Sequence, residues 1–218
     1  MNDRLNFAAG EIVGPPTAPL VVIGFCGQKA AGKDIASEYL VTRHGFQSMG
    51  FGDAVRRSAR EEYGLDNPTV GDLIRIGNEG RQKSGDNGYW ARQLIKMIQE
   101  GAVYRAVVQG IRNPGEIIRL SETLGQRFFL IGITAPLRLR AERLMARGRS
   151  GDPRTLEAFM NLDDADRGIG QPPDGQRTDD CLARVDLANR FVNDGTLDEF
   201  HAWLDGRVDQ AIRTAVRR

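Results

Sequence analysis

The sequence predicts an α/β fold in which buried parallel strands alternate with helices. Short apolar, β-branched runs recur along the chain, as is typical of strands covered on both faces of a parallel sheet. A loop rich in glycine or proline and then a helical pattern follow each run. The length of 218 residues and a 40% hydrophobic content suit a single globular core.

Composition and charge exclude several classes of protein. Thirty basic and twenty-nine acidic residues give a net charge of +1, which argues against strong nonspecific binding to nucleic acid. No apolar stretch approaches the roughly 18 to 20 residues of a membrane span. The two cysteines and two histidines lie far apart, so no zinc-binding spacing exists; they are Cys26, Cys181, His44 and His201.

Residues 1–19 are expected to form a flexible arm before the domain, which spans residues 20–218, because glycines and prolines interrupt any periodicity. The arm lacks the apolar region of a secretory signal, so a cytoplasmic location is expected. A disulfide between Cys26 and Cys181 stays open, but a reducing compartment disfavours it.

The first elements are a strand from Leu20 to Phe25 and a helix over residues 34–44 that ends at Gly45. Two further strands are expected at 106–108 and 128–133. A helix that opens near a proline follows each of them, one from Pro114 to Gly125 and one from Pro136 to Gly148.

The polar segment 153–184 predicts a helix plus a long loop lying over the sheet. A short strand at 190–193 and a helix from about Leu197 complete the alternating pattern.

The strongest motif is a glycine-x4-glycine-lysine loop between the first strand and the first helix, the context that a phosphate-binding loop requires. Its glycines let backbone N–H groups turn towards phosphate oxygens, and the helix N-terminus and the lysine add positive charge. The loop and the residue after it are Gly27, Gln28, Lys29, Ala30, Ala31, Gly32, Lys33 and Asp34. The alternative is a strand-to-helix turn that binds no ligand.

Asp34 stands where this motif usually has a serine or threonine that contacts Mg²⁺. A carboxylate is a hard oxygen ligand and can hold magnesium directly or through water, so Asp34 is a candidate metal ligand. It also suits the first turn of a helix, where the dipole favours an acid.

Arginines gather on one face of the helix after Pro136, at Arg140, Arg143 and Arg147, and Arg149 follows at once. Guanidinium groups beside a glycine-terminated loop suit the charge of a transferring phosphoryl group. A solvated basic face is the alternative for these side chains.

A second candidate site follows the strand at 106–108, where Arg112 and Glu116 lie at the sheet edge that binds ligands in open α/β folds. Asp53 and Arg56 begin another helix and are candidates to face an acceptor substrate. Asp53 also suits a helix-capping role.

These motifs together resemble P-loop nucleotide kinases of the nucleoside monophosphate kinase and dephospho-coenzyme A kinase group, over about residues 20–205. The loop ending in glycine-lysine-aspartate and the segment 76–81 with Trp90 resemble phage-type deoxynucleoside monophosphate kinases. The second half resembles archaeal dephospho-coenzyme A kinase-like proteins and kinase-like domains fused to deoxycytidylate deaminases. The motifs that carry the resemblance beyond the loop are Phe-Gly-Asp-Ala at 51–54, Gly-Ile-Arg-Asn-Pro-Gly-Glu at 110–116, the arginine-rich 142–149 and Val-Asn-Asp-Gly at 192–195.

The resemblance implies a P-loop three-layer sandwich: a five-stranded parallel sheet with helices on both faces and a short arginine-rich lid around residues 140–185. It implies ATP and Mg²⁺ as cofactors and a small nucleotide as substrate. Residues 27–34 would bind the ATP phosphates, and Asn193 and Gly195 would lie near the adenine. The implied lid arginines are Arg143, Arg147 and Arg149, and the implied acceptor side includes Asp53, Arg56, Arg81, Arg112, Glu116 and Arg149.

One position departs from the family pattern. Relatives carry an aspartate before the Ile-Arg pair, whereas this chain has Gln109. A glutamine neither takes a proton nor offers Mg²⁺ a negative charge. Either Asp34 or Asp53 supplies the carboxylate, or turnover is weak and the domain chiefly binds nucleotide.

The sequence therefore favours an ATP-dependent phosphotransferase whose acceptor is a (deoxy)nucleoside monophosphate, with Lys33, Asp53, Arg112, Arg143 and Arg147 as the catalytic candidates. One alternative is an enzyme that phosphorylates a ribose hydroxyl of dephospho-coenzyme A with Asp53 as the base. Another is a nucleotide-sensing module, which Gln109 favours. A kinase for modified bases within DNA suits the near-neutral charge less well. Assembly as a homodimer stays open.

Overall fold

The computed structural model describes residues 20–148 and 152–216, so the arm expected at 1–19 and Arg149 lie outside the described residues. Five parallel strands form one sheet in the order β2-β3-β1-β4-β5. The five-stranded parallel sheet is thereby confirmed. The strands are β1 (Val21–Gly27), β2 (Gln47–Gly50), β3 (Arg105–Gln109), β4 (Phe128–Thr134) and β5 (Arg190–Val192).

Helices follow the strands closely where the sequence predicts them. Gly45 and Gly148 adopt left-handed backbone conformations just after the last residues of α1 and α6, as the expected stop signals require. The helices are α1 (Lys33–His44), α2 (Phe51–Glu61), α3 (Val70–Ser84), α4 (Tyr89–Glu100), α5 (Pro114–Leu124), α6 (Leu137–Arg147), α7 (Leu156–Arg167), α8 (Thr178–Ala183) and α9 (Leu197–Val216).

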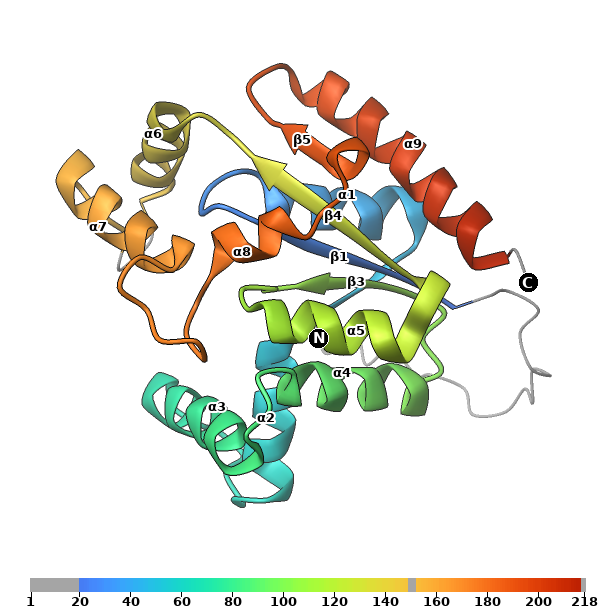
Figure 1. Ribbon diagram of the computed structural model, residues 1–218, viewed down its shortest axis with the longest axis vertical. Coiled ribbons are helices and arrows are strands. Elements are labelled where there is room, and N and C mark those ends of the chain that lie inside the picture. Colours follow the sequence, from blue (N-terminus) through green and yellow to red (C-terminus); the bar gives the residue numbers. More distant parts are fainter. Residues whose placement is uncertain (1–19, 149–151, 217–218) are drawn as a thin grey trace, which may run out of the picture.

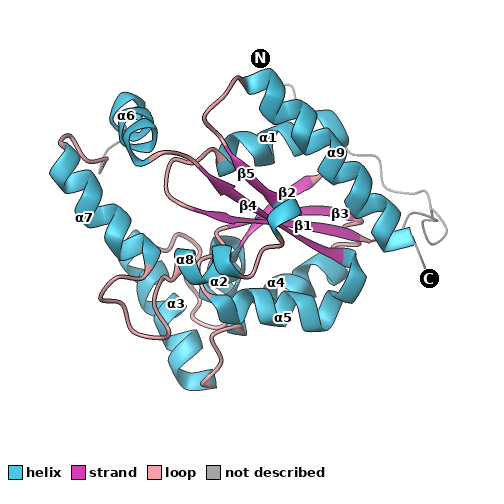
Figure 2. Cartoon of the chain, turned by 45° about the horizontal axis from the view of Figure 1, so that its top comes forward, coloured by secondary structure: helices cyan, strands magenta, loops and turns pink. Residues whose placement is uncertain are grey.

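The sheet forms the middle of three layers. Helices α1 and α9 cover one face, and α4 and α5 cover the other (Figures 1 and 2). Because strand side chains alternate, Val21 and Ile23 of β1 pack towards α1 and α9, whereas Val22 and Cys26 pack into the cluster that contains α2, α4, α5 and α8. This double burial explains the uninterrupted apolar runs in the strands.

Two groups of helices extend beyond the carboxyl ends of the strands, α6 with α7 on one side and α2 with α3 on the other (Figure 1). A small cluster of Ala141, Leu144 and Phe159 joins α6 to α7, and Ala30 of the glycine-rich loop packs against it. The α6–α7 segment is therefore attached directly to the loop.

Two segments differ from the sequence-based expectation. The region between Asp53 and Trp90, for which the sequence predicted only a helix beginning near Asp53, is mostly helical and contains most of α2 and all of α3. The segment 153–184 contains a short second helix, α8, besides the expected helix and loop. Cys26 and Cys181 are both buried and free. Within the part of the chain that the structure describes, no helix is both long and apolar enough to cross a membrane.

Candidate functional site

The glycine-rich loop has a backbone that only glycine fits at two positions. Gly27 has φ 139°, and a Cβ there would lie 1.9 Å from the carbonyl oxygen of Ile133. Gly32 has φ 115°, and a Cβ there would lie 2.4 Å from Asn193 Nδ2. Both contacts are far inside van der Waals distance, so the motif glycines are required for the chain to turn here.

Lys33 folds back over the loop. Its Nζ donates hydrogen bonds to the carbonyl oxygens of Gly27 at 2.6 Å and Gln28 at 2.8 Å. Burial lowers the pKa of Lys33 to about 8, while the negative charge of Asp166 acts in the opposite direction. The charged ammonium is thus costly in the ligand-free site, and a phosphate beside it would offset that cost.

Asn193 attaches the end of β5 to the loop. Its Nδ2 donates to the carbonyl oxygen of Ala31 at 2.8 Å, and its backbone N–H donates to Thr134 O at 2.7 Å. Gly195 follows in the turn before α9, where a Cβ would lie 2.4 Å from a carboxylate oxygen of Glu199. Asn193 therefore lies against the glycine-rich loop, and its contact with an adenine stays a prediction.

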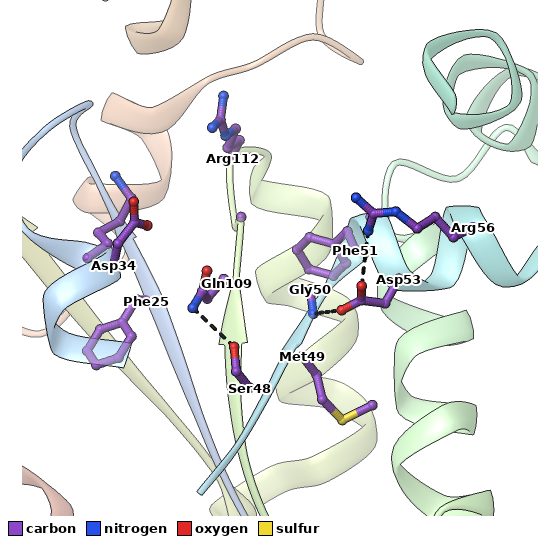
Figure 3. A pocket seen from close by; sticks show the side chains of 13 residues that line it. Phe25, Asp34, Ser48, Met49, Gly50, Phe51, Asp53, Arg56, Gln109 and Arg112 are labelled. Carbon is purple, nitrogen blue, oxygen red and sulfur yellow. Dashed lines mark hydrogen bonds and ion pairs between the residues drawn. The ribbon is translucent and has the colours of Figure 1, made fainter. Parts of the chain in front are cut away.

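A cleft of about 380 Å³ lies at the carboxyl edge of β1, β2 and β3 (Figure 3). It brings residues predicted to bind the donor phosphates together with residues predicted to face the acceptor: Lys33, Asp34, Asp53, Arg56 and Arg112. We call it the loop cleft.

Gln109 lines the loop cleft at the end of β3. Its Nε2 donates hydrogen bonds to the hydroxyl oxygens of Ser37 at 2.5 Å and Ser48 at 3.1 Å. The amide oxygen points away from Ser48 (Figure 3). Gln109 thus offers the cleft a neutral oxygen where a relative's aspartate would offer a charged one.

Asp53 caps a helix and also lines the loop cleft, and its contact with an acceptor stays a prediction. One carboxylate oxygen accepts a hydrogen bond from the backbone N–H of Gly50 at 2.8 Å and so caps α2. The other accepts from Arg56 Nη1 at 3.1 Å, and both side chains line the loop cleft. Both residues are exposed, so a ligand can compete for either.

Arg112 is held by α7. Its Nη1 donates to Asp166 Oδ1 at 3.1 Å and to Gln176 Oε1 at 3.0 Å. Asp166 is only 4% exposed and also accepts from Thr178 Oγ1 at 3.4 Å. Asp166 was not among the residues that the sequence predicted for the site, although its spacing of three residues from Asp163 on one helix was an available signal.

A second cleft of about 460 Å³ adjoins the first and shares Phe51, Gly110 and Arg112 with it. We call it the amide cleft, because the side chains of Asn78, Gln82, Asn113, Gln171 and Gln176 line it. Arg81 and Glu116 lie in the same cleft, so two further predicted acceptor residues are brought together here.

Glu116 caps the helix α5 from inside the fold. One oxygen, Oε2, accepts hydrogen bonds from the backbone N–H groups of Arg112 at 2.8 Å and Asn113 at 3.1 Å. Burial raises the pKa of Glu116 to about 7, and the two backbone hydrogen bonds oppose that rise.

Glu116 makes the free energy of unfolding depend on pH. Its folded pKa of about 7 lies above its ordinary value of 4.5, so its stabilisation is complete below pH 4.5 and is lost as the pH rises through 7. Relative to Glu116→Gln, the wild type should lose on the order of 3 kcal/mol between pH 4.5 and 8. Urea unfolding of both proteins across this range measures the difference, and parallel profiles would contradict it.

The three predicted arginines of α6 lie in three different environments, whereas Arg138 is exposed and pairs with Glu142. Arg140 turns inward and pairs with the buried Asp163, so it does not join a free arginine face. Arg147 pairs with Asp152 through two hydrogen bonds. Arg143, one turn beyond Arg140, has a buried Nη1 that finds no hydrogen-bond partner among the described residues. A ligand oxygen would satisfy that group.

Comparison with known proteins identifies relatives along most of the chain. A UPF0200 protein from Methanothrix thermoacetophila is 32% identical over 182 residues, which cover 82% of this chain and 91% of the relative. The chain belongs to the UPF0200 family. A second UPF0200 protein, from Aeropyrum pernix, is 31% identical over 193 residues, 86% of this chain and 93% of its own. No family model matches the chain.

A solved structure supports the fold of this UPF0200 protein. An uncharacterized protein from Eubacterium ventriosum aligns with a TM-score of 0.54 at 12% identity, covering 87% of this chain and 98% of its own. The APS kinase CysC of Mycobacterium tuberculosis, in complex with AMPPNP and APS, aligns with a TM-score of 0.49 at 14% identity over 88% of this chain and 99% of its own.

The oxygen ligands that line the loop cleft are few, and they suit a magnesium ion held mainly through phosphate oxygens and water. Asp34 and Asp53 supply carboxylate oxygens and Gln109 an amide oxygen, all hard ligands. Among the described residues, no three histidine, cysteine or acidic side chains gather closely enough to hold a metal ion by themselves.

Proposed function

We propose that this UPF0200 protein is an ATP- and Mg²⁺-dependent phosphotransferase that acts on a small nucleotide acceptor, a (deoxy)nucleoside monophosphate. The observation that carries the proposal is the pair of adjoining clefts that share Arg112. One cleft begins at the glycine-rich loop, and the other is lined by five amide side chains and by two basic and two acidic residues. A phosphoryl donor and a polar acceptor would meet at Arg112.

The chain supplies positive charge where phosphates would lie. Lys33 belongs to the loop, Arg112 stands at the boundary between the clefts, and Arg143 carries an unsatisfied buried N–H on the neighbouring lid segment. Phosphoryl transfer depends on positioning and charge stabilisation more than on covalent chemistry by the protein. These cations would orient the donor and acceptor phosphates in line.

Asp34, Gln109 and Asp53 are the residues that would hold the cation. Mg²⁺, when bound with ATP, neutralises charge on the phosphate oxygens. Backbone N–H groups of residues 27–33 would surround the same phosphates.

Acceptor-dependent ADP release tests the proposal. The four deoxynucleoside monophosphates, their ribose forms and dephospho-coenzyme A would each be supplied with Mg-ATP. Release that depends on a nucleoside monophosphate supports the proposal. ATP binding without release for any acceptor would refute it and favour a nucleotide-sensing module.

Transfer to the ribose hydroxyl of dephospho-coenzyme A is a second candidate, because Asp53 lines the loop cleft as a carboxylate able to accept a proton. Asp53→Asn should then abolish release with this acceptor. Unchanged release with the alcohol acceptor would count against Asp53 as a base.

Neutralising Asp166 is expected to increase the affinity for ATP by about tenfold. Among the charges near Lys29 and Lys33, the Asp166 carboxylate most strongly raises their pKa values, which burial lowers. Asp166 also pairs with Arg112. A phosphate must compete with this carboxylate, so Asp166→Asn should lower the Kd, which calorimetry measures; a tenfold change corresponds to about 1.4 kcal/mol. Asp164→Asn on the exposed side of α7 is the control. Weaker binding by Asp166→Asn would show instead that the carboxylate helps to hold the nucleotide.

A further inference from the structure

The amide cleft offers a mixture of hydrogen-bond donors and acceptors with little net charge. Its lining includes five amide side chains, and its charged groups are balanced, with Arg81 and Arg112 against Glu116 and Asp174. The ring of Phe51 lies at the boundary with the loop cleft. Amide groups pair with the edges of nucleobases, and aromatic rings stack on their faces.

Within this cleft, Glu116 presents an unpaired oxygen. The residue is 6% exposed, and its Oε2 takes both backbone hydrogen bonds. Its Oε1 has no hydrogen-bond partner among the described residues and is absent from the fully buried unsatisfied atoms, so it opens into the cleft that the residue lines. A carboxylate oxygen removed from bulk water in this way needs a donor from a ligand.

Arg112 and Glu116 would bind different parts of one ligand that spans both clefts. Arg112, at the boundary, suits the acceptor phosphate. Glu116 would repel a second anionic group and favours a neutral group that carries N–H donors. A planar heterocycle next to a phosphate meets both demands and also has a face for Phe51.

We infer that Glu116 determines acceptor specificity by accepting, through Oε1, a hydrogen bond from the N–H edge of the acceptor's base. This inference rests on the proposed function, because it assigns the amide cleft to the acceptor. The preferred acceptors carry a ring N–H or an exocyclic amino group at this edge. Bases that present only acceptor atoms there are disfavoured.

The substitution Glu116→Gln tests the inference because glutamine has nearly the same side-chain shape as glutamate. The amide oxygen of glutamine can still accept both backbone hydrogen bonds, while its NH₂ group replaces the acceptor that faces the cleft. Calorimetry with each nucleoside monophosphate at pH 8, with and without a nonhydrolysable ATP analogue, should give about a tenfold loss of affinity for the preferred acceptor. The order of preference should move towards bases that present an acceptor atom. Glu122→Gln, an exposed change on the same helix, should leave the order unchanged.

Wild-type protein provides a second test that depends on no variant. Methylation that removes the donor to Glu116, at the ring N–H or at both hydrogens of the exocyclic amino group, should weaken the preferred acceptor by at least about tenfold. Three results would each overturn the inference. They are a uniform loss of affinity for all acceptors in Glu116→Gln, an unchanged order of acceptor preference in that variant, and full affinity of the wild-type protein for the methylated base.

Failure of the proposed function is distinguishable from failure of the inference. Binding in the predicted order without ADP release would support the inference while refuting the phosphotransferase. Transfer whose acceptor order ignores Glu116 would do the reverse. If wild-type protein binds no nucleoside monophosphate, the inference is wrong.

Discussion

Replacing Lys33 with alanine is expected to lower acceptor-dependent ADP release on the order of 10³-fold. Lys33 is held over the loop by the carbonyl oxygens of Gly27 and Gln28, at the position where the phosphates of ATP would lie. The variant removes the positive charge of the lysine that ends the glycine-x4-glycine-lysine motif. Steady-state ADP release with the preferred acceptor measures the effect.

Lys96→Ala is the matched control for this variant. Lys96 lies on α4, is exposed and pairs only weakly with Glu100, at 3.6 Å. Its loss should leave both ADP release and ATP affinity within about twofold of wild type. If Lys33→Ala kept most of its activity, the assignment of the phosphate site to this loop would be wrong.

The elements around the phosphate loop were predictable from the sequence because local signals agree there. The strand before Gly27 is apolar and β-branched, and the helix after Lys33 ends where Gly45 takes a left-handed conformation. The strand β2 gave a weaker signal, since Gln47 and Ser48 are exposed at the sheet edge. Only the resemblance to nucleotide kinases implied a fifth strand.

Contacts between distant elements could not be predicted from the sequence. Periodicity places Arg140, Arg143 and Arg147 near one face of α6, yet Arg140 is buried because α7 brings Asp163 to meet it. The pairing of Arg112 with Asp166 spans 54 residues and likewise depends on how α7 packs. Charge alone does not distinguish an arginine that binds phosphate from one that is already satisfied.

In the candidate site as well, the sequence predicted which residues lie together but not their individual contacts. Asp53, Arg56, Arg112 and Glu116 line the two clefts because they follow β2 and β3, parallel strands whose carboxyl ends lie at one edge. Arg81 reaches the same region from α3. The unpaired Oε1 of Glu116 depends on which of its oxygens accepts from the backbone N–H groups of Arg112 and Asn113, just before α5, and no sequence pattern carries that detail.

Replacing Arg140 with alanine is expected to lower the free energy of unfolding by about 3 to 5 kcal/mol. Arg140 is 2% exposed and Asp163 is fully buried, and two hydrogen bonds join them. The variant leaves the Asp163 carboxylate buried without a partner, which costs more than the ion pair itself contributes. It also removes the bonds from Arg140 to the carbonyl oxygens of Ala135 and Lys29. Urea unfolding measures the loss.

The double variant Arg140→Met/Asp163→Leu separates the buried charge from the other contacts of Arg140. It should recover most of the stability, because apolar side chains of similar size can replace a buried ion pair at little cost. Arg138→Ala, on the exposed side of the same helix, should change stability by less than about 1 kcal/mol. If the double variant were as unstable as Arg140→Ala, the contacts with Lys29 and Ala135, and not the unpaired Asp163, would carry the loss. If instead it regained stability but bound ATP less tightly, the role of Arg140 in holding the loop for phosphate would stand apart from its role in folding.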